Sequence, residues 1–183
     1  MEIVKVENFA EMTNGNVYYE LDGEFYQRCW NCGKPVAIDW HLTKSDLNRD
    51  DVIEEAFCDE KCEKEWFLSQ YRTLDSAMVA GEEERIKKFW KFNITKAYVS
   101  CEYDDESSEH EAIAPAGELT VEELTAIARD YAKDTARVDS YFRTMTMKEE
   151  AYIQIFEDSV DISCTFTQGD FSADITVSFV FAR

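Results

Sequence analysis

The chain has 183 residues, 45% of them hydrophobic and 14% aromatic, which is enough length and apolar surface to bury a core. Asp and Glu total 39 against 19 Lys and Arg, so the net charge is −20, with −8 in residues 1–93 and −12 in residues 94–183. A chain with this net charge should repel phosphate backbones, because nucleic-acid binders need a basic surface, and it should also repel anionic membranes. The charge suits a basic protein partner, or it serves solubility alone.

The chain contains no run of about 18 apolar residues, and residues 1–12 are acidic and mixed rather than signal-like. We therefore expect no membrane span and a cytoplasmic location. Thiols stay reduced in the cytosol, so the six cysteines are expected to be metal ligands or core residues rather than disulfide partners.

The first predicted element is a β-hairpin over residues 17–27, where two aromatic-rich runs flank Asp22-Gly23, a favoured two-residue turn. The hairpin leads directly into Cys29. Residues 36–57 are expected to be irregular or partly helical.

From Cys58 onward the pattern is helical, because Cys58, Cys62 and Trp66 recur every four residues and so share one face. A second helical pattern covers residues 74–92, and Gly81 is a position at which it could divide into two helices.

The pattern changes after residue 93. Residues 96–103 alternate as a strand, and an acidic loop is expected over residues 104–111. Thr120 and Glu123 form a capping box that opens a helix extending to about residue 134. Further strands are predicted over residues 137–147, 151–157, 159–167 and 171–182, and the alternation of the last is the clearest. One polar face on such strands indicates an antiparallel sheet that is solvated on that side.

Four of the six cysteines are spaced as metal ligands, in the patterns Cys29-x2-Cys32 and Cys58-x3-Cys62. Zn²⁺ takes four thiolates in a tetrahedron, and each pair can aim two sulfurs at one point, the first in a tight turn with a glycine and the second within one helical turn. Four thiolates leave no open position for water, so the predicted zinc site is structural rather than catalytic. The alternatives are four free buried thiols, a redox Cys-x2-Cys without its usual βαβ setting, and His41 in place of one cysteine.

The order of hairpin, cysteine knuckle and cysteine-bearing helix resembles a treble-clef zinc finger. More narrowly, "FCDEKCEKEWF" at residues 57–67 is similar to the FCS, MYM and TRASH group, in which aromatic residues precede and follow the second cysteine pair. Phe57, Trp66 and Phe67 stand at those places. The resemblance covers residues 29–67, and it implies zinc and protein contacts but no reaction.

These elements predict an α+β fold in two parts. Residues 1–93 would form a treble-clef-like Zn(Cys)4 segment with helices. Residues 94–183 would form an acidic unit of antiparallel sheet with one helix. The boundary between the two parts is weakly marked in the sequence, so the alternative is that they share one core.

The two remaining cysteines, Cys101 and Cys164, lie on apolar faces of predicted strands and are expected in the core. A nucleophilic pair of Cys101 with His110 is the catalytic alternative. The chain has only two histidines and no GxGxxG, P-loop, HExxH or GxSxG motif, so its sequence indicates no enzyme class.

Two groups of acidic residues are candidate contacts for a basic partner. They are Asp50, Asp51, Glu54 and Glu55 in the spacer between the cysteine pairs, and Asp104, Asp105, Glu106, Glu109 and Glu111 in the expected acidic loop. The second group lacks the glycine and the ligand spacing of a calcium loop, and a solvated surface is the alternative for both groups.

Together these features predict a non-enzymatic protein-binding module held by structural zinc. Small acidic anti-restriction and anti-CRISPR proteins of phages and mobile elements are similar in size and charge. That resemblance implies an inhibitor that imitates DNA and blocks a nucleic-acid-binding protein. The alternatives are a metal-responsive or regulatory zinc-finger protein, an enzyme with an unrecognised carboxylate or cysteine site, and an accessory subunit.

Overall fold

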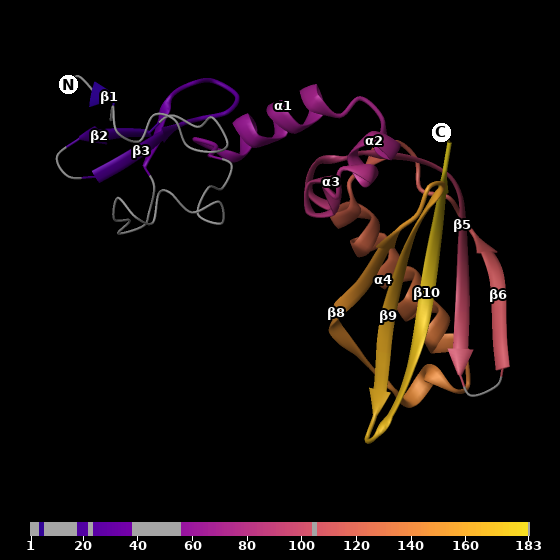
Figure 1. Ribbon diagram of the computed structural model, residues 1–183. Helices are drawn as coiled ribbons and strands as arrows, with labels where there is room; N and C mark the ends of the chain where they lie inside the picture. Colours follow the sequence, from indigo (N-terminus) through magenta and orange to yellow (C-terminus); the bar gives the residue numbers. More distant parts are fainter. Residues whose placement is uncertain (1–3, 6–17, 22–23, 38–55, 104–105, 183) are drawn as a thin grey trace. The chain divides into compact units, whose positions relative to one another are not determined.

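The structure, a computed structural model, describes residues 4–5, 18–21, 24–37, 56–103 and 106–182 (Figure 1). The chain divides into two compact units, residues 1–72 and residues 73–183, and each is described here by itself. Helices and antiparallel sheets make up both units, so the predicted α+β class is confirmed.

The described residues of the first unit form a small antiparallel sheet and one helix. Its described strands run in the order β1 (Val4–Lys5), β2 (Tyr18–Leu21), β3 (Glu24–Arg28) and β4 (Pro35–Ala37). Strands β2 and β3 are the predicted hairpin, with Tyr19 opposite Tyr26. The helix α1 (Glu60–Gln70) begins between Cys58 and Cys62, so the predicted helix is present but starts two residues later than the pattern from Cys58 indicated.

The second unit is a larger antiparallel sheet with a long helix on one face (Figure 1). Its helices are α2 (Leu74–Val79), α3 (Glu83–Phe89), α4 (Val121–Val138) and the 3-10 turn η2 (Phe142–Thr144). Its strands are β5 (Phe92–Tyr103), β6 (Glu106–Ala112), β7 (Glu118–Leu119), β8 (Thr146–Ile155), β9 (Ser159–Gln168) and β10 (Phe171–Phe181). The strand order is β6-β5-β10-β9-β8, and β7 pairs with β5.

The core of this unit lies between α4 and the sheet, because alternate residues of the central strands point toward the helix. The fully buried sheet residues include Val99, Val160, Ile162, Ile175, Val177 and Phe179. Leu124 supplies a large side chain from α4, whereas Ala128, Ala132 and Ala136 recur every four residues and let the helix backbone approach the strands.

Two predicted elements differ from the structure. The predicted acidic loop over 104–111 is wrong from Glu106 on, because those residues form β6 and pair with β5. An edge strand hydrogen-bonds on one side only, so the polar sequence "ESSEHEA" can form it without apolar alternation. The predicted strand over 137–147 is also wrong at its start, where α4 continues to Val138 and η2 follows before β8 begins.

The division between the units falls after Arg72, whereas the sequence suggested a boundary near residue 93. The intervening helices α2 and α3 bury Leu74, Ala77, Ile86 and Phe89 within the second unit, where α3 contacts α4. Gly81 separates the two helices with φ +78°, a left-handed conformation that glycine adopts without strain. The folding of either unit as an independent domain stays a prediction.

Across the described ranges, the helices are either too short or too polar to cross a bilayer.

The capping box predicted at the start of α4 is present. The Thr120 hydroxyl accepts from the Glu123 backbone N–H at 3.4 Å, and the Glu123 carboxylate accepts from the Thr120 N–H at 2.8 Å. We expect Thr120→Ala to lower the free energy of unfolding of the second unit by about 1 kcal/mol, because the Glu123 backbone N–H loses the hydroxyl that accepts its hydrogen bond. Urea denaturation followed by circular dichroism measures the loss, and Thr120→Ser, which keeps the hydroxyl, should unfold like the parent chain. An alanine variant as stable as the serine variant would contradict the role of the box.

Candidate metal centre

The first cysteine pair is held by a turn that closes directly after β3. Cys29 donates its backbone N–H to the Lys34 carbonyl at 2.7 Å, and Gly33 donates to the Cys29 carbonyl at 2.9 Å. Gly33 has φ +73°, so a side chain at this position would strain the turn. The turn carries Cys29 and Cys32 on one tight loop, as the spacing predicts.

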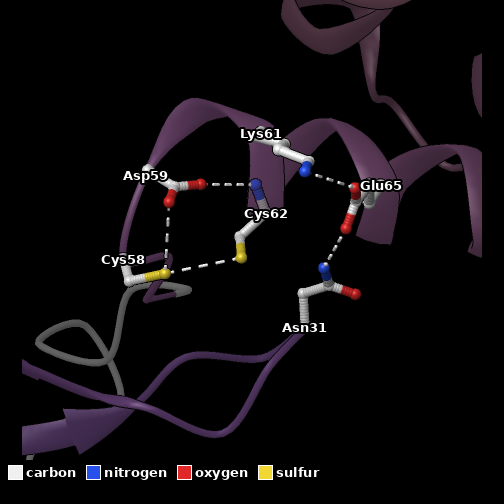
Figure 2. A network of polar contacts seen from close by, with 6 residues as sticks. All are labelled: Asn31, Cys58, Asp59, Lys61, Cys62 and Glu65. Carbon is white, nitrogen blue, oxygen red and sulfur yellow. Dashed lines mark hydrogen bonds and ion pairs between the residues drawn. The ribbon is translucent and has the colours of Figure 1, made fainter.

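The second pair is placed by the start of α1. Asp59 caps the helix, and its carboxylate accepts from the Cys62 backbone N–H at 2.7 Å (Figure 2). Cys58 lies just before the cap and Cys62 in the first turn, so both sulfurs lie at the end of the helix where its dipole favours negative charge. The capping role of Asp59 could have been predicted from an Asp before a helical pattern.

Two hydrogen bonds join the turn of residues 29–34 to the segment that carries the second cysteine pair. The Trp30 backbone N–H donates to the Ala56 carbonyl at 2.9 Å, just before the second pair. The Asn31 side chain donates to the Glu65 carboxylate at 2.9 Å, and Glu65 also pairs with Lys61 at 3.7 Å (Figure 2). The cysteine spacing gives no sign of either contact.

The four cysteine sulfur atoms lie close together in one cluster. All four Sγ atoms are within 4.8 Å of one another, with Cys32 and Cys58 at 3.6 Å and Cys58 and Cys62 at 3.4 Å. A tetrahedral metal with metal–sulfur bonds of about 2.3 Å separates its sulfurs by about 3.8 Å. No pair is joined as a disulfide, since all six cysteines are free thiols. The cluster therefore has the composition and the dimensions to hold a metal ion.

The thiols of this cluster differ in acidity. Burial opposes the Cys29 thiolate, yet backbone N–H groups of Cys32, Cys58 and Asn31 donate to its sulfur and lower its pKa to about 6. The pKa of Cys58 is raised, first by its contact with the Cys62 sulfur and then by burial and the other two sulfurs. Four crowded sulfurs cannot all ionise alone, and a bound cation would relieve this repulsion.

An aromatic group stands beside the sulfurs. The Trp30 and Trp66 rings meet edge to face with centroids 5.6 Å apart, and Phe57 lies 5.4 Å from Trp66. Phe67 is fully buried, and its ring centroid lies 5.4 Å from that of Tyr71. Of the aromatic residues singled out in the sequence, Phe57 and Trp66 thus pack in one group with Trp30, whereas Phe67 packs with Tyr71.

Among the described residues, the cluster contains none of the other candidates. Asp50, Asp51, Glu54, Glu55, Asp104 and Asp105 fall outside the described residues, as does His41. Glu106, Glu109 and Glu111 lie on β6. Cys101 and Cys164 are buried on β5 and β9, each opposite Ile175, and burial raises the pKa of both thiols. The register places Ser108, not His110, opposite Cys101, which does not favour the alternative catalytic pair.

Comparison with known proteins adds one finding. A family model described as a family of unknown function (DUF7576) matches residues 14–67, a stretch that includes all four clustered cysteines. No curated protein and no solved structure matches the chain. The fold and the site thus define an α+β protein with a four-cysteine cluster able to hold a metal ion, and none of these comparisons indicates an enzyme.

Proposed function

We propose that the four-cysteine cluster is a structural Zn²⁺ site of the treble-clef type, related to the FCS, MYM and TRASH group. Hairpin, knuckle and helix occur in that order, and the sulfur separations suit a tetrahedral ion. The small sheet of the first unit has few buried side chains among its described residues. A bound metal would therefore supply much of the stability of the first unit.

We further propose that the chain is a non-enzymatic protein-binding module whose binding surface is the open face of the larger sheet. The observation that carries this proposal is the strand register. It aligns polar residues of neighbouring strands on the face away from α4, and the acidic ones among them are Glu102, Glu109, Glu111, Asp161 and Asp174. We name these five residues the acidic sheet face.

The hydroxyl groups of this face lie between its carboxylates. One row across the sheet runs from Glu109 through Ser100, Thr176 and Ser163 to Tyr152. The Ser163 and Thr176 hydroxyls are hydrogen-bonded at 2.8 Å. Burial raises the pKa of Asp161, although Ser178 and Ser159 donate to its carboxylate. A surface of carboxylates and hydroxyls suits the lysines and arginines of a basic protein.

The chain keeps this face at a cost in stability. Glu102 and Asp174 stand directly opposite each other on β5 and β10, and like charges at such a position destabilise a sheet. Solubility needs acidic residues on the surface, but it does not need two of them facing each other. The opposed pair therefore supports the view that these carboxylates are retained for binding a partner rather than for solubility alone.

The partner that these features favour is a basic protein, in particular one that normally holds DNA or RNA. The sheet face would then take the place of a phosphate backbone, and the chain would act as an inhibitor of that protein, as acidic anti-CRISPR and anti-restriction proteins do. Direct binding of nucleic acid has no support, because the carboxylates would repel the phosphates.

Reversing one charge of the opposed pair separates binding from stability. We expect Asp174→Lys to raise the free energy of unfolding by about 0.2–1 kcal/mol, because a repulsive cross-strand pair becomes attractive. The same variant should lose the partner. Glu84→Lys on α3 is the matched control, since it makes the same charge change at an exposed acid away from the sheet face.

The partner assay is capture by the tagged full-length chain from nuclease-treated bacterial lysate, with elution by rising salt and identification by mass spectrometry. We expect nucleic-acid-binding proteins that elute as salt rises, retained by the parent and Glu84→Lys chains but not by Asp174→Lys. Equal retention by all three, or partners that resist high salt, would contradict the acidic sheet face as the binding surface.

A metal-responsive protein is the second candidate function, and the exposure of Cys32 favours it. A ligand sulfur open to solvent permits faster metal exchange than a fully buried one. This role predicts that partner capture changes when a chelator removes the metal and returns when zinc is added. If removal of the metal does not change capture of the partner, the metal has only a structural role.

A further inference from the structure

Basic residues gather in one segment of this acidic chain. Of the seven Lys and Arg in residues 94–183, five lie between residues 129 and 148, where there are only three acids. Arg129, Lys133 and Arg137 are spaced four residues apart, so they form a row along one side of α4. Arg129 donates to the backbone carbonyls of Lys148 and Glu149, and so ties this row to the irregular start of β8.

The same part of the molecule is hollowed. A pocket of about 400 Å³ lies among the end of α4, the turn η2, the start of β8 and one residue of β9. Its apolar wall is made by Phe142, Met145, Met147 and Phe166, and the cations Lys133, Arg137 and Arg143 also line it. This volume is within the range of roughly 300–1,000 Å³ typical of small-molecule sites.

The wall of the pocket combines fixed and adaptable parts. Phe142 and Phe166 are buried and meet edge to face with ring centroids 5.4 Å apart. The Asp139 carboxylate accepts from the backbone N–H groups of Tyr141 and Phe142, which holds the turn in place. Met145 and Met147 are half-buried, and their flexible side chains can adjust to a ligand.

The cations at the pocket are available to a ligand. Lys133 pairs with Asp130 at 3.5 Å and Arg137 with Asp134 at 2.8 Å, but these exposed pairs are weak and can be exchanged for a better partner. In the part of the chain that the structure describes, no ion pair involves Arg143. Three cations beside an apolar wall match a ligand with an anionic head and an apolar body.

We propose that this pocket binds a small amphipathic anion, with its apolar body against the two phenylalanines and two methionines and its carboxylate or phosphate head at Lys133, Arg137 and Arg143. The ligand is small because the carboxylates elsewhere on the chain repel an extended polyanion. The pocket shares no residue with the cysteine cluster or with the acidic sheet face.

The methionines allow a direct test in the full-length chain. We label their methyl groups with ¹³C and titrate octanoate, with octyl phosphate as a second head group and octyltrimethylammonium as the cation of matched chain length. We expect the methyl signals of Met145 and Met147, assigned with Met→Leu variants, to shift and saturate with either anion. Met78 on α2 lies outside the pocket lining and should not shift. The anion that saturates at the lower concentration identifies the preferred head group.

Charge reversal then tests the role of the cations. We expect Arg143→Glu and Arg137→Glu each to weaken binding by at least about tenfold, because an attractive contact with the head becomes repulsive. Lys96→Glu is the control, since it reverses an exposed charge on β5 away from the pocket. The proposal is overturned if neither anion gives a saturating shift, if the cation shifts both methyl groups as strongly, or if Arg143→Glu and Lys96→Glu bind alike.

Discussion

We expect Cys62→Ser to abolish metal binding and to unfold the first unit. Cys62 is buried in the first turn of α1, where its backbone is held by Asp59 and its sulfur lies 3.4 Å from that of Cys58. Serine is a poor ligand for Zn²⁺, and zinc contributes an apparent ~10–16 kcal/mol to the folding of small finger peptides. Loss of one ligand should therefore remove most of the stability of this unit.

The measurement combines metal content with the signal of the aromatic group. Metal analysis of the purified variant should show the loss of about one equivalent of zinc, and the fluorescence of Trp30 and Trp66 should shift toward that of exposed indoles. Cys164→Ser is the matched control, because Cys164 is also buried but lies in the larger sheet on β9, outside the four-cysteine cluster. A Cys62→Ser chain that retains its zinc and its fluorescence would refute the site.

The second large effect is expected in the core of the sheet unit. Phe179 is fully buried near the end of β10, with its ring centroid 6.5 Å from that of Tyr131 on α4. We expect Phe179→Ala to lower the free energy of unfolding by about 3–5 kcal/mol, because a large cavity would open between the helix and the sheet. Urea denaturation followed by circular dichroism measures this loss.

Phe171 provides a control on the same strand. Its side chain is 72% exposed at the start of β10, so Phe171→Ala should change the free energy of unfolding by less than about 0.5 kcal/mol. The sequence pattern placed Phe171 on the inner face together with Phe179, and only the structure separates the two. Equal losses from both variants would contradict the core that we describe.

The regular parts of the fold could be predicted because each has a local cause. Residues 171–182 alternate, so β10 was predicted almost to its ends, and the capping box marks the first residue of α4. The strand β6 could not be predicted in this way. Its pairing with β5 depends on backbone hydrogen bonds to a neighbour, which its polar side chains do not reveal.

The cysteine cluster was also accessible from sequence, since thiolate spacing reflects the geometry that a metal requires. The hydrogen bond between Asn31 and Glu65 could not be predicted from sequence, because those residues are far apart in the chain and neither belongs to a motif. The pocket beside η2 could not be predicted from sequence either. Its wall combines residues from α4, η2, β8 and β9, which only tertiary folding brings together.

The most direct test of the account is X-ray absorption at the zinc edge of the purified full-length chain. We predict a first coordination shell of four sulfur atoms at about 2.3 Å, supplied by Cys29, Cys32, Cys58 and Cys62. A first shell that contains nitrogen or oxygen, as His41 or water would supply, would contradict a closed four-cysteine site. A chain purified from zinc-supplemented cells that contains no zinc would contradict the structural role on which the account rests.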